Sequence, residues 1–309
     1  MSQAVATRTP SRFLEWLPTT VDRRIRVFAW LSFAAEVLII ATGGAVRLTG
    51  SGLGCPTWPT CTPESLVNTP EMGIHGVIEF GNRTLTGLVG ILALIVVALV
   101  WRMRRERRDL FLLALVVVGG VIAQAIVGGI TVLTGLNPFI VGFHYVASLL
   151  LVCVCAAFLV RMNTEPGPRA RVVPLWYART AFATLVPLAL TIVFGVLTTG
   201  AGPHSGDIEA GRNGFNAEVL EHVHAWPGYV LLACLLVLVG AAWAQRLAAR
   251  RWATTLLGVV LVQIGVGIYQ ARNGLPELAV GVHMVLAALS AAAMTVLLLN
   301  LTRRAHPRG

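Results

Sequence analysis

The chain contains no lysine, and it has few charged residues of any kind. Only 12% of its 309 residues are charged, whereas a soluble domain carries about 25%. Hydrophobic residues make up 56% of the chain, and the mean hydropathy is +0.76. This composition argues against an ordinary soluble enzyme and indicates a protein that lies mostly within a membrane.

Apolar segments long enough to cross a bilayer recur along the whole chain. A spanning helix needs about 20 apolar residues, so the sequence predicts an all-α membrane protein with eight transmembrane helices. Very short breaks at 135–138 and 271–276 predict two tight helical hairpins. The predicted spans are 27–46, 77–101, 110–133, 139–160, 175–198, 219–243, 253–271 and 278–300.

Arginine alone carries the positive charge, and its distribution predicts the orientation. Arginines gather before the first span, between the second and third, at 161–179, at 246–251 and at 303–308. The opposite loops hold few, so the positive-inside rule places both termini in the cytoplasm. Because these arginines flank spans on one face, membrane lipid is the expected partner, and nucleic acid is not. The first apolar run lacks a convincing cleavage site and is therefore predicted to be an anchor.

Cysteine is scarce, and two of the five cysteines lie in the first external loop, 48–73. Cys55 and Cys61 are separated by five residues and can close a small disulfide loop in an oxidising compartment. Such a bond is either a structural staple or a redox-active pair, and the sequence leaves both open. The other three, Cys153, Cys155 and Cys234, lie in apolar helices and are interpreted as small core residues.

One pattern of polar residues occurs twice within the apolar helices. Each half has a pair in the form E-x-x-N or E-x-x-H, then a glutamine, then a histidine twenty residues after the glutamine. Such side chains are costly inside a membrane, so matched positions indicate two related internal sites. Facing helices of a bundle can present two imidazoles to a haem iron, whereas no helix pair here offers zinc four close ligands. The residues are Glu79, Asn82, Gln124 and His144, then Glu221, His224, Gln263 and His283.

Two arginines lie near the outer ends of the helices that carry this pattern. Arg47 and Arg83 are predicted to pair with haem propionates through bidentate contacts. Glycines on several helices supply room for a flat macrocycle, although small residues also serve ordinary helix packing.

The sequence from Gly43 to Leu53, followed by Cys55-Pro56 and Trp58-Pro59, resembles the first-helix and first-loop signature of haem A synthases. The E-x-x-N-R motif from Glu79 to Arg83 fits the same family, as do the histidines at 144, 224 and 283. The resemblance extends over about residues 27–300. The cysteine pair is also a feature of that family.

The resemblance implies two pseudo-symmetric four-helix bundles and an enzyme that oxidises a methyl group of haem O to a formyl group, making haem A for terminal oxidases. His224 and His283 would be the axial ligands of a haem b, and His144 that of the substrate haem. A buried carboxylate, Glu79, is predicted to be catalytic, either stabilising positive charge at the reacting carbon or acting as a base. The haem b would relay electrons to an external acceptor.

The expected organisation follows from the same resemblance. Haem O synthase and the assembly of terminal oxidases are the expected partners, a homo-oligomer is compatible with the sequence, and the haem sites face the extracytoplasmic side of the cell membrane. The expected segments are a cytoplasmic arginine-rich part (1–25), a substrate half (26–162), a cytoplasmic linker (163–174), a haem b half (175–300) and a cytoplasmic tail (301–309).

The chain departs from the family pattern at Asn82, where a histidine is usual. The substrate site therefore lacks its expected second axial ligand. Either His75 replaces it from about two turns away, roughly 10 Å along the axis, or the iron is bound through His144 alone.

Two other classes of protein remain to be weighed against the synthase. A non-enzymatic two-haem membrane cytochrome, relaying electrons to or from quinone, would use the same histidines but would have no need of Glu79 or of an asymmetric first site. A transporter would place unwound helices near the midplane, whereas the polar residues here lie toward the outer ends of their spans.

Overall fold

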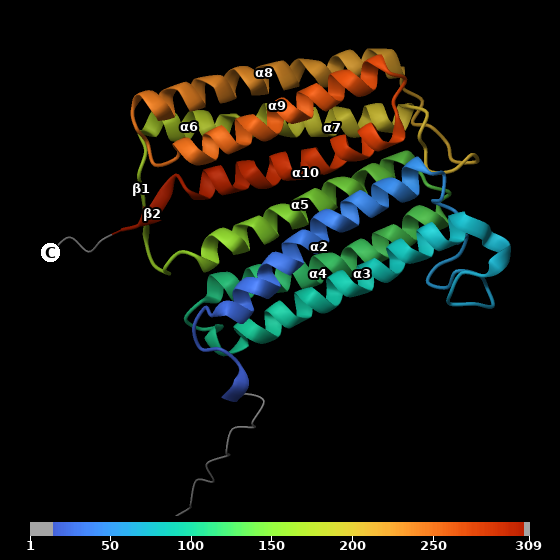
Figure 1. Ribbon diagram of the computed structural model, residues 1–309, viewed down its shortest axis with the longest axis horizontal. Helices are drawn as coiled ribbons and strands as arrows, with labels where there is room; N and C mark the ends of the chain where they lie inside the picture. Colours follow the sequence, from blue (N-terminus) through green and yellow to red (C-terminus); the bar gives the residue numbers. More distant parts are fainter. Residues whose placement is uncertain (1–14, 306–309) are drawn as a thin grey trace, which may run out of the picture.

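The computed structural model describes residues 15–305, and almost all of them are helical (Figure 1). Eight helical segments in this part of the chain are long and apolar enough to cross a membrane, which confirms the predicted count. They comprise α2 (Arg23–Leu48), α3 (Gly73–Val100, flanked by the 3-10 turns η1, Pro70–Met72, and η2, Trp101–Met103), α4 (Arg108–Leu133), α5 (Pro138–Met162), α6 (Leu175–Ala183) with α7 (Leu185–Ala201), α8 (Ala217–Ala244), α9 (Arg250–Arg272) and α10 (Glu277–Leu299).

The fifth span is interrupted, although the sequence predicts one continuous helix over 175–198. Helix α6 ends at Ala183 and α7 begins at Leu185, with Thr184 between them. Pro187 has no N–H to donate to the carbonyl of Ala183, four residues earlier, and its ring crowds that carbonyl. The interruption therefore lies one helical turn before the proline.

Both predicted tight hairpins are present, and they share a backbone conformation. Gly135 and Leu136 join α4 to α5, while Gly274 and Leu275 join α9 to α10. Leu136 and Leu275 have φ of 58° and 59°, in the left-handed region that leucine rarely adopts. In both hairpins a proline follows at the start of the next helix, where its missing N–H costs nothing.

The helices form two groups that lie side by side (Figure 1). Helices α2 to α5 make the first group and α6 to α10 the second, and α10 packs against both α5 and α2. A buried cluster joins the groups, with Ile40 of α2, Leu149 and Val152 of α5, and Ala288 and Ala292 of α10. The relation of the two groups by an internal repeat rests on the sequence pattern.

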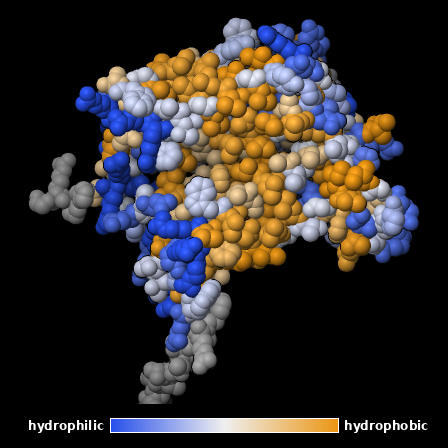
Figure 2. Space-filling view, viewed as in Figure 1, coloured by the Kyte–Doolittle hydropathy of each residue, from blue (hydrophilic) through white to orange (hydrophobic). Residues whose placement is uncertain are grey.

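Apolar side chains cover the middle of the molecule, and hydrophilic ones cover its two ends (Figure 2). Large side chains such as Leu38, Ile91, Val116 and Leu236 are exposed around this middle region. Exposed apolar area of this extent is expected where lipid, not water, surrounds the protein. The chain is thus a multi-pass membrane protein.

A short two-stranded ribbon lies at the arginine-rich end, where the sequence predicts only a linker and a tail. Strand β1 (Arg169–Arg171) pairs antiparallel with β2 (Thr302–Arg304). The Arg169 Nη2 also donates to the backbone oxygen of Thr302, at 3.3 Å. The outermost parts of the predicted N-terminal segment and tail, 1–14 and 306–309, lie outside the described residues.

Candidate functional site

One pocket lies between the two helix groups and takes its walls from both. Its lining includes all three histidines of the repeat and both glutamines, together with Asn82. The sequence pattern therefore brings together residues that are up to about two hundred positions apart in the chain. The described lining of the pocket does not include Glu79, Arg83 or Glu221.

His224 and His283 face each other across the second helix group. Their ring centroids are 6.2 Å apart, and their planes are inclined by 72°. Two imidazoles bound to opposite sides of one metal ion place their centroids roughly 6 Å apart, because each metal–nitrogen bond is about 2 Å long and each ring adds its own radius. The separation in the structure fits a pair of axial ligands.

Hydrogen bonding leaves the metal-binding nitrogen of His224 unoccupied. Its Nδ1 lies 2.8 Å from the backbone oxygen of Thr191 on α7. Such a contact fixes the tautomer and orients Nε2 for a metal, as in most histidine ligands. Within residues 15–305, the Nδ1 atoms of His144 and His283 are buried without a hydrogen-bond partner.

Each of the three histidine rings lies against a glycine of the preceding helix. A Cβ at Gly195 would lie 2.8 Å from His224 Cε1, and one at Gly267 would lie 3.0 Å from His283 Cε1. A Cβ at Gly128 would lie 3.4 Å from His144 Cε1. Real Cβ atoms rarely approach other atoms as closely as at Gly195 and Gly267, so glycine permits the rings of His224 and His283 to lie against the neighbouring helix.

His144 belongs to the first helix group and is held through its backbone. Gln124 Nε2 donates to the His144 carbonyl at 2.8 Å and also contacts Ser148 Oγ. Asn82 lies across the pocket wall on α3, where its Oδ1 accepts a hydrogen bond of 2.7 Å from Thr42 Oγ1. The first group thus contributes one imidazole to the pocket.

His75 is not positioned to replace the missing histidine. It is exposed at the outer end of α3, and its Nδ1 lies 2.9 Å from Ser51 Oγ. It is absent from the described lining of the pocket. The structure therefore favours the alternative in which His144 is the single imidazole of this site.

Arg47 lies at the outer end of the pocket, where the predicted role requires it. Its Nε donates to the backbone oxygen of His204 at 2.8 Å, and its Nη2 to that of Thr199 at 3.0 Å. These contacts join α2 to the loop after α7, and Gly52 N–H extends the link by donating to Gly206 O at 2.8 Å. Gly202, Pro203 and His204 of the loop after α7 line this end of the pocket.

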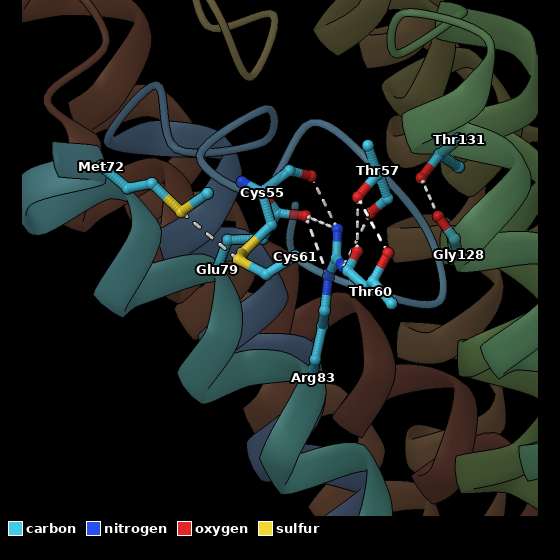
Figure 3. Close-up of polar contacts among 9 residues, drawn as sticks. All are labelled: Cys55, Thr57, Thr60, Cys61, Met72, Glu79, Arg83, Gly128 and Thr131. Carbon is cyan, nitrogen blue, oxygen red and sulfur yellow. Dashed lines mark hydrogen bonds and ion pairs between the residues drawn. A yellow bond between two sulfur atoms is a disulfide. The ribbon is translucent and has the colours of Figure 1, made fainter. Parts of the chain in front are cut away.

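Glu79 and Arg83 contact the first external loop (Figure 3). The Glu79 carboxylate accepts a hydrogen bond of 2.6 Å from Cys55 N–H and pairs with Arg83 at 2.5 Å. Arg83 also donates to the backbone oxygens of Cys55, Thr57 and Thr60. All three guanidinium nitrogens are thus engaged by Glu79 and the loop, and the pairing of Arg83 with a propionate stays a prediction.

The same loop contains the predicted disulfide, which the structure confirms between Cys55 and Cys61. Both cysteines are fully buried. Between them, Trp58 packs its ring on the backbone of Gly129 in α4, where a Cβ would lie 2.4 Å from Trp58 Cδ2. Gly129 is next to Gly128, so the loop is placed directly beside the helix segment that supports His144.

Glu36 and His204 also line the pocket, and sequence reasoning assigned a role to neither. Glu36 lies midway along α2 and is only 2% exposed, and His204 comes from the loop after α7. The signal for Glu36 was visible as a carboxylate in the middle of an apolar span, which is rare and costly. His204 gave no signal, because a histidine in an external loop is ordinary.

These features define an eight-span membrane protein in which two helix groups share a histidine-lined pocket that opens toward the loops at one end of the bundle. The family model described as cytochrome oxidase assembly protein matches residues 26–295, and the chain belongs to that family. This confirms the resemblance identified from the motifs.

Two relatives named heme A synthase match most of the chain, and a third matches less than half of it. The protein of that name from Alkalihalophilus pseudofirmus is 24% identical over 308 residues, covering 93% of this chain and 100% of the relative. The Listeria monocytogenes protein is 25% identical over 289 residues, covering 88% and 92%. A third, from Lysinibacillus sphaericus, is 38% identical over 131 residues, or 40% and 41%. The relatives are enzymes of haem biosynthesis by name.

Proposed function

We propose that this protein is a haem A synthase, which oxidises one methyl group of haem O to the formyl group of haem A. The family match and the full-length relatives named heme A synthase support this assignment. The observation that carries it in the structure is the shared pocket, with a facing pair of imidazoles in one helix group and a single imidazole in the other.

The second helix group suits a resident haem b. His224 and His283 would hold it from both sides, and Thr191 would keep His224 in the required tautomer. Held by His224 and His283, the haem would supply one-electron transfer between the substrate site and an external acceptor.

The first helix group suits the substrate haem. His144 would bind its iron, while Asn82, already hydrogen-bonded to Thr42, leaves the opposite side without a second imidazole. The hydrogen bonds that Arg47 donates to the backbone within residues 15–305 use Nε and Nη2, which leaves Nη1 to take a propionate.

Glu79 and Arg83 would act on this site through the disulfide loop. Their contacts fix Cys55, Thr57 and Thr60, and the loop in turn places Trp58 beside the helix that supports His144. A loop held in this way excludes water from the outer end of the pocket. A direct role of Glu79 in stabilising charge on the substrate is the alternative.

The proposed orientation places the arginine-rich end of the molecule in the cytoplasm and the loops with the pocket opening outside. The halves would be 26–162 for the substrate and 175–300 for haem b. Haem O synthase would supply the substrate, and the assembly of terminal oxidases would consume the product.

The test of the function is the identity of the haems that the purified protein carries. Haems extracted from the full-length protein are separated by reversed-phase chromatography, and a reduced-minus-oxidised spectrum is recorded from the same sample. We expect haem B together with haem O or haem A. Haem B alone at two per chain would instead establish the electron-relaying cytochrome, and the absence of haem would refute both.

We expect Glu79→Gln to lower turnover by at least about tenfold while the resident haem stays bound. The change removes the charge from hydrogen bonds that contribute about 1.5–3 kcal/mol each, and 1.4 kcal/mol corresponds to tenfold. Turnover and haem content are measured on the same preparation. The matched control is Glu221→Gln, because Glu221 is the repeat counterpart and is exposed.

Arg83→Gln separates the two roles of Glu79. If Glu79 acts by holding the loop, Arg83→Gln loses as much activity as Glu79→Gln, since both residues hold the same backbone. If Glu79 acts directly on the substrate, Arg83→Gln is the milder change. Unchanged turnover in Glu79→Gln would refute both roles.

A further inference from the structure

A carboxylic acid lies deep in the pocket and has no role in the function proposed so far. Glu36 is 2% exposed, lines the pocket, and stands at the middle of α2. Within residues 15–305, its Oε1 is buried and has no hydrogen-bond partner. Buried polar atoms in proteins are nearly always paired, and a carboxyl group inside a membrane is especially costly. A ligand that supplies the missing partner would explain its presence.

Glu36 shares one face of α2 with two other residues of the pocket. Gly43 follows it by seven residues and Arg47 by eleven, which are close to two and three whole helical turns. A Cβ at Gly43 would meet no atom of the described chain within 4 Å, so this part of the wall is open. At 1.5 Å per residue, roughly 16 Å of helix separate Glu36 from Arg47.

This face matches the polarity of a porphyrin substrate. A haem carries both propionates on one edge, and that edge would lie at the outer end, beside Arg47. Its ring would then pass the open wall at Gly43, and the opposite edge would reach toward Glu36. The carboxyl group is therefore placed to contact a substituent on the membrane-buried edge.

The acid belongs to the first helix group alone. The corresponding span of the second group, made of α6 and α7, contains no aspartate or glutamate between 175 and 201. The residues that line the pocket near Glu36 include Val89 of α3, Val121 of α4 and Leu151 of α5, all from the first group. A group found only in the half with a single imidazole is expected to serve the substrate and not the resident haem.

The chemistry of the two haems indicates what such a group would recognise. Haem O carries a hydroxyl group on its isoprenoid side chain, next to the ring, where haem B has a vinyl group. We propose that Glu36 forms a hydrogen bond with this hydroxyl group and so makes the substrate site selective for haem O over haem B. This inference rests on the proposed function.

The expected size of the effect follows from the hydrogen bond. A site built to bind a hydroxyl group discriminates strongly against a ligand that lacks it, because the buried polar group of the site is then left unpaired. Removal of the carboxyl group should therefore lower the preference for haem O by about ten-fold or more.

The test is a binding titration of the purified full-length protein, with its resident haem in place, with haem O and with haem B. Binding at equilibrium is measured by absorption spectroscopy. The variants are Glu36→Leu and Glu36→Gln, with His144→Ala to define the signal of the substrate site. Ser290→Ala is the matched control, because Ser290 is 3% exposed, its Oγ is buried and unpartnered within the described chain, and it is not among the described lining residues.

We expect Glu36→Leu to weaken haem O binding while haem B binding stays the same or improves, Glu36→Gln to lie between it and the unaltered protein, and Ser290→Ala to match the unaltered protein. The resident haem spectrum shows that each variant is folded. Equal weakening for both haems, or an unchanged preference in both Glu36 variants, would overturn the inference and leave the proposed function intact. If the unaltered protein binds haem O no better than His144→Ala does, the proposed function fails together with the inference.

Discussion

Replacing His283 with alanine is expected to remove the resident haem. The ring of His283 faces that of His224 at 6.2 Å, and the other histidine that this half contributes to the pocket, His204, has its Nε2 3.0 Å from the backbone oxygen of Leu275. Loss of an axial ligand should reduce haem retention by more than about tenfold, since even the partners that orient metal ligands change affinity by 10–100-fold. Haem b per protein, measured by absorption after purification, tests this, and turnover should be lost with it.

The matched control for this change is His222→Ala. His222 is on α8, two residues before His224, but it is exposed, and its Nδ1 contacts the backbone of Glu218 at 2.8 Å. His222→Ala should keep its full complement of haem b, and His224→Ala should behave as His283→Ala does. A normal haem b spectrum in both His224→Ala and His283→Ala would show that these residues are not the axial ligands.

Replacing Asn82 with histidine is expected to change the coordination of the substrate haem. The new imidazole would lie on α3, beside α2. Gly43 of α2 leaves open space in the pocket wall, just as Gly195 of α7 leaves space for the ring of His224. A second imidazole would convert the iron from a five-coordinate, high-spin state to a six-coordinate, low-spin state. Substrate haem should also be retained about tenfold more strongly, which corresponds to about 1.4 kcal/mol.

Spectroscopy of the protein loaded with haem O measures this change. The control is Asn82→Ala, which removes the hydrogen bond from Thr42 but adds no ligand, and it should leave the high-spin signal unaltered. A low-spin substrate haem in the unaltered protein, still present in Asn82→Ala, would mean that another residue supplies the second ligand. That result would contradict the single-imidazole site.

The membrane spans and the three histidines were predictable from the sequence for one reason. A bilayer demands about 20 apolar residues per helix, so a histidine or glutamine within such a run stands out against its neighbours. The repeat then singled out His144, His224 and His283, which all line the pocket. Of the histidines outside the repeat, His75 and His222 do not line it, whereas His204 does. Asn82, the repeat counterpart of His224, also lines the pocket.

The structure was less predictable where contacts between distant segments decide it. Glu79 and Arg83 are one helical turn apart on α3, but their partners lie in a loop that precedes the helix. No periodicity of the sequence predicts such contacts. Strands β1 and β2 have three residues each and pair across more than a hundred residues. The break at Thr184 was within reach, because Pro187 is visible in the sequence and its effect on the preceding turn is general.

The ribbon of β1 and β2 has a mechanical consequence. An even number of spans returns the chain to the end of the bundle at which it entered, and the ribbon ties the exit after α10 to the segment that leads into α6. A load applied to the carboxyl terminus would therefore pass first into the connection between the two helix groups and only then into α10. A fusion partner attached there would pull on the joint between the groups, at the end of the molecule farthest from the loops that cover the pocket (Figure 1).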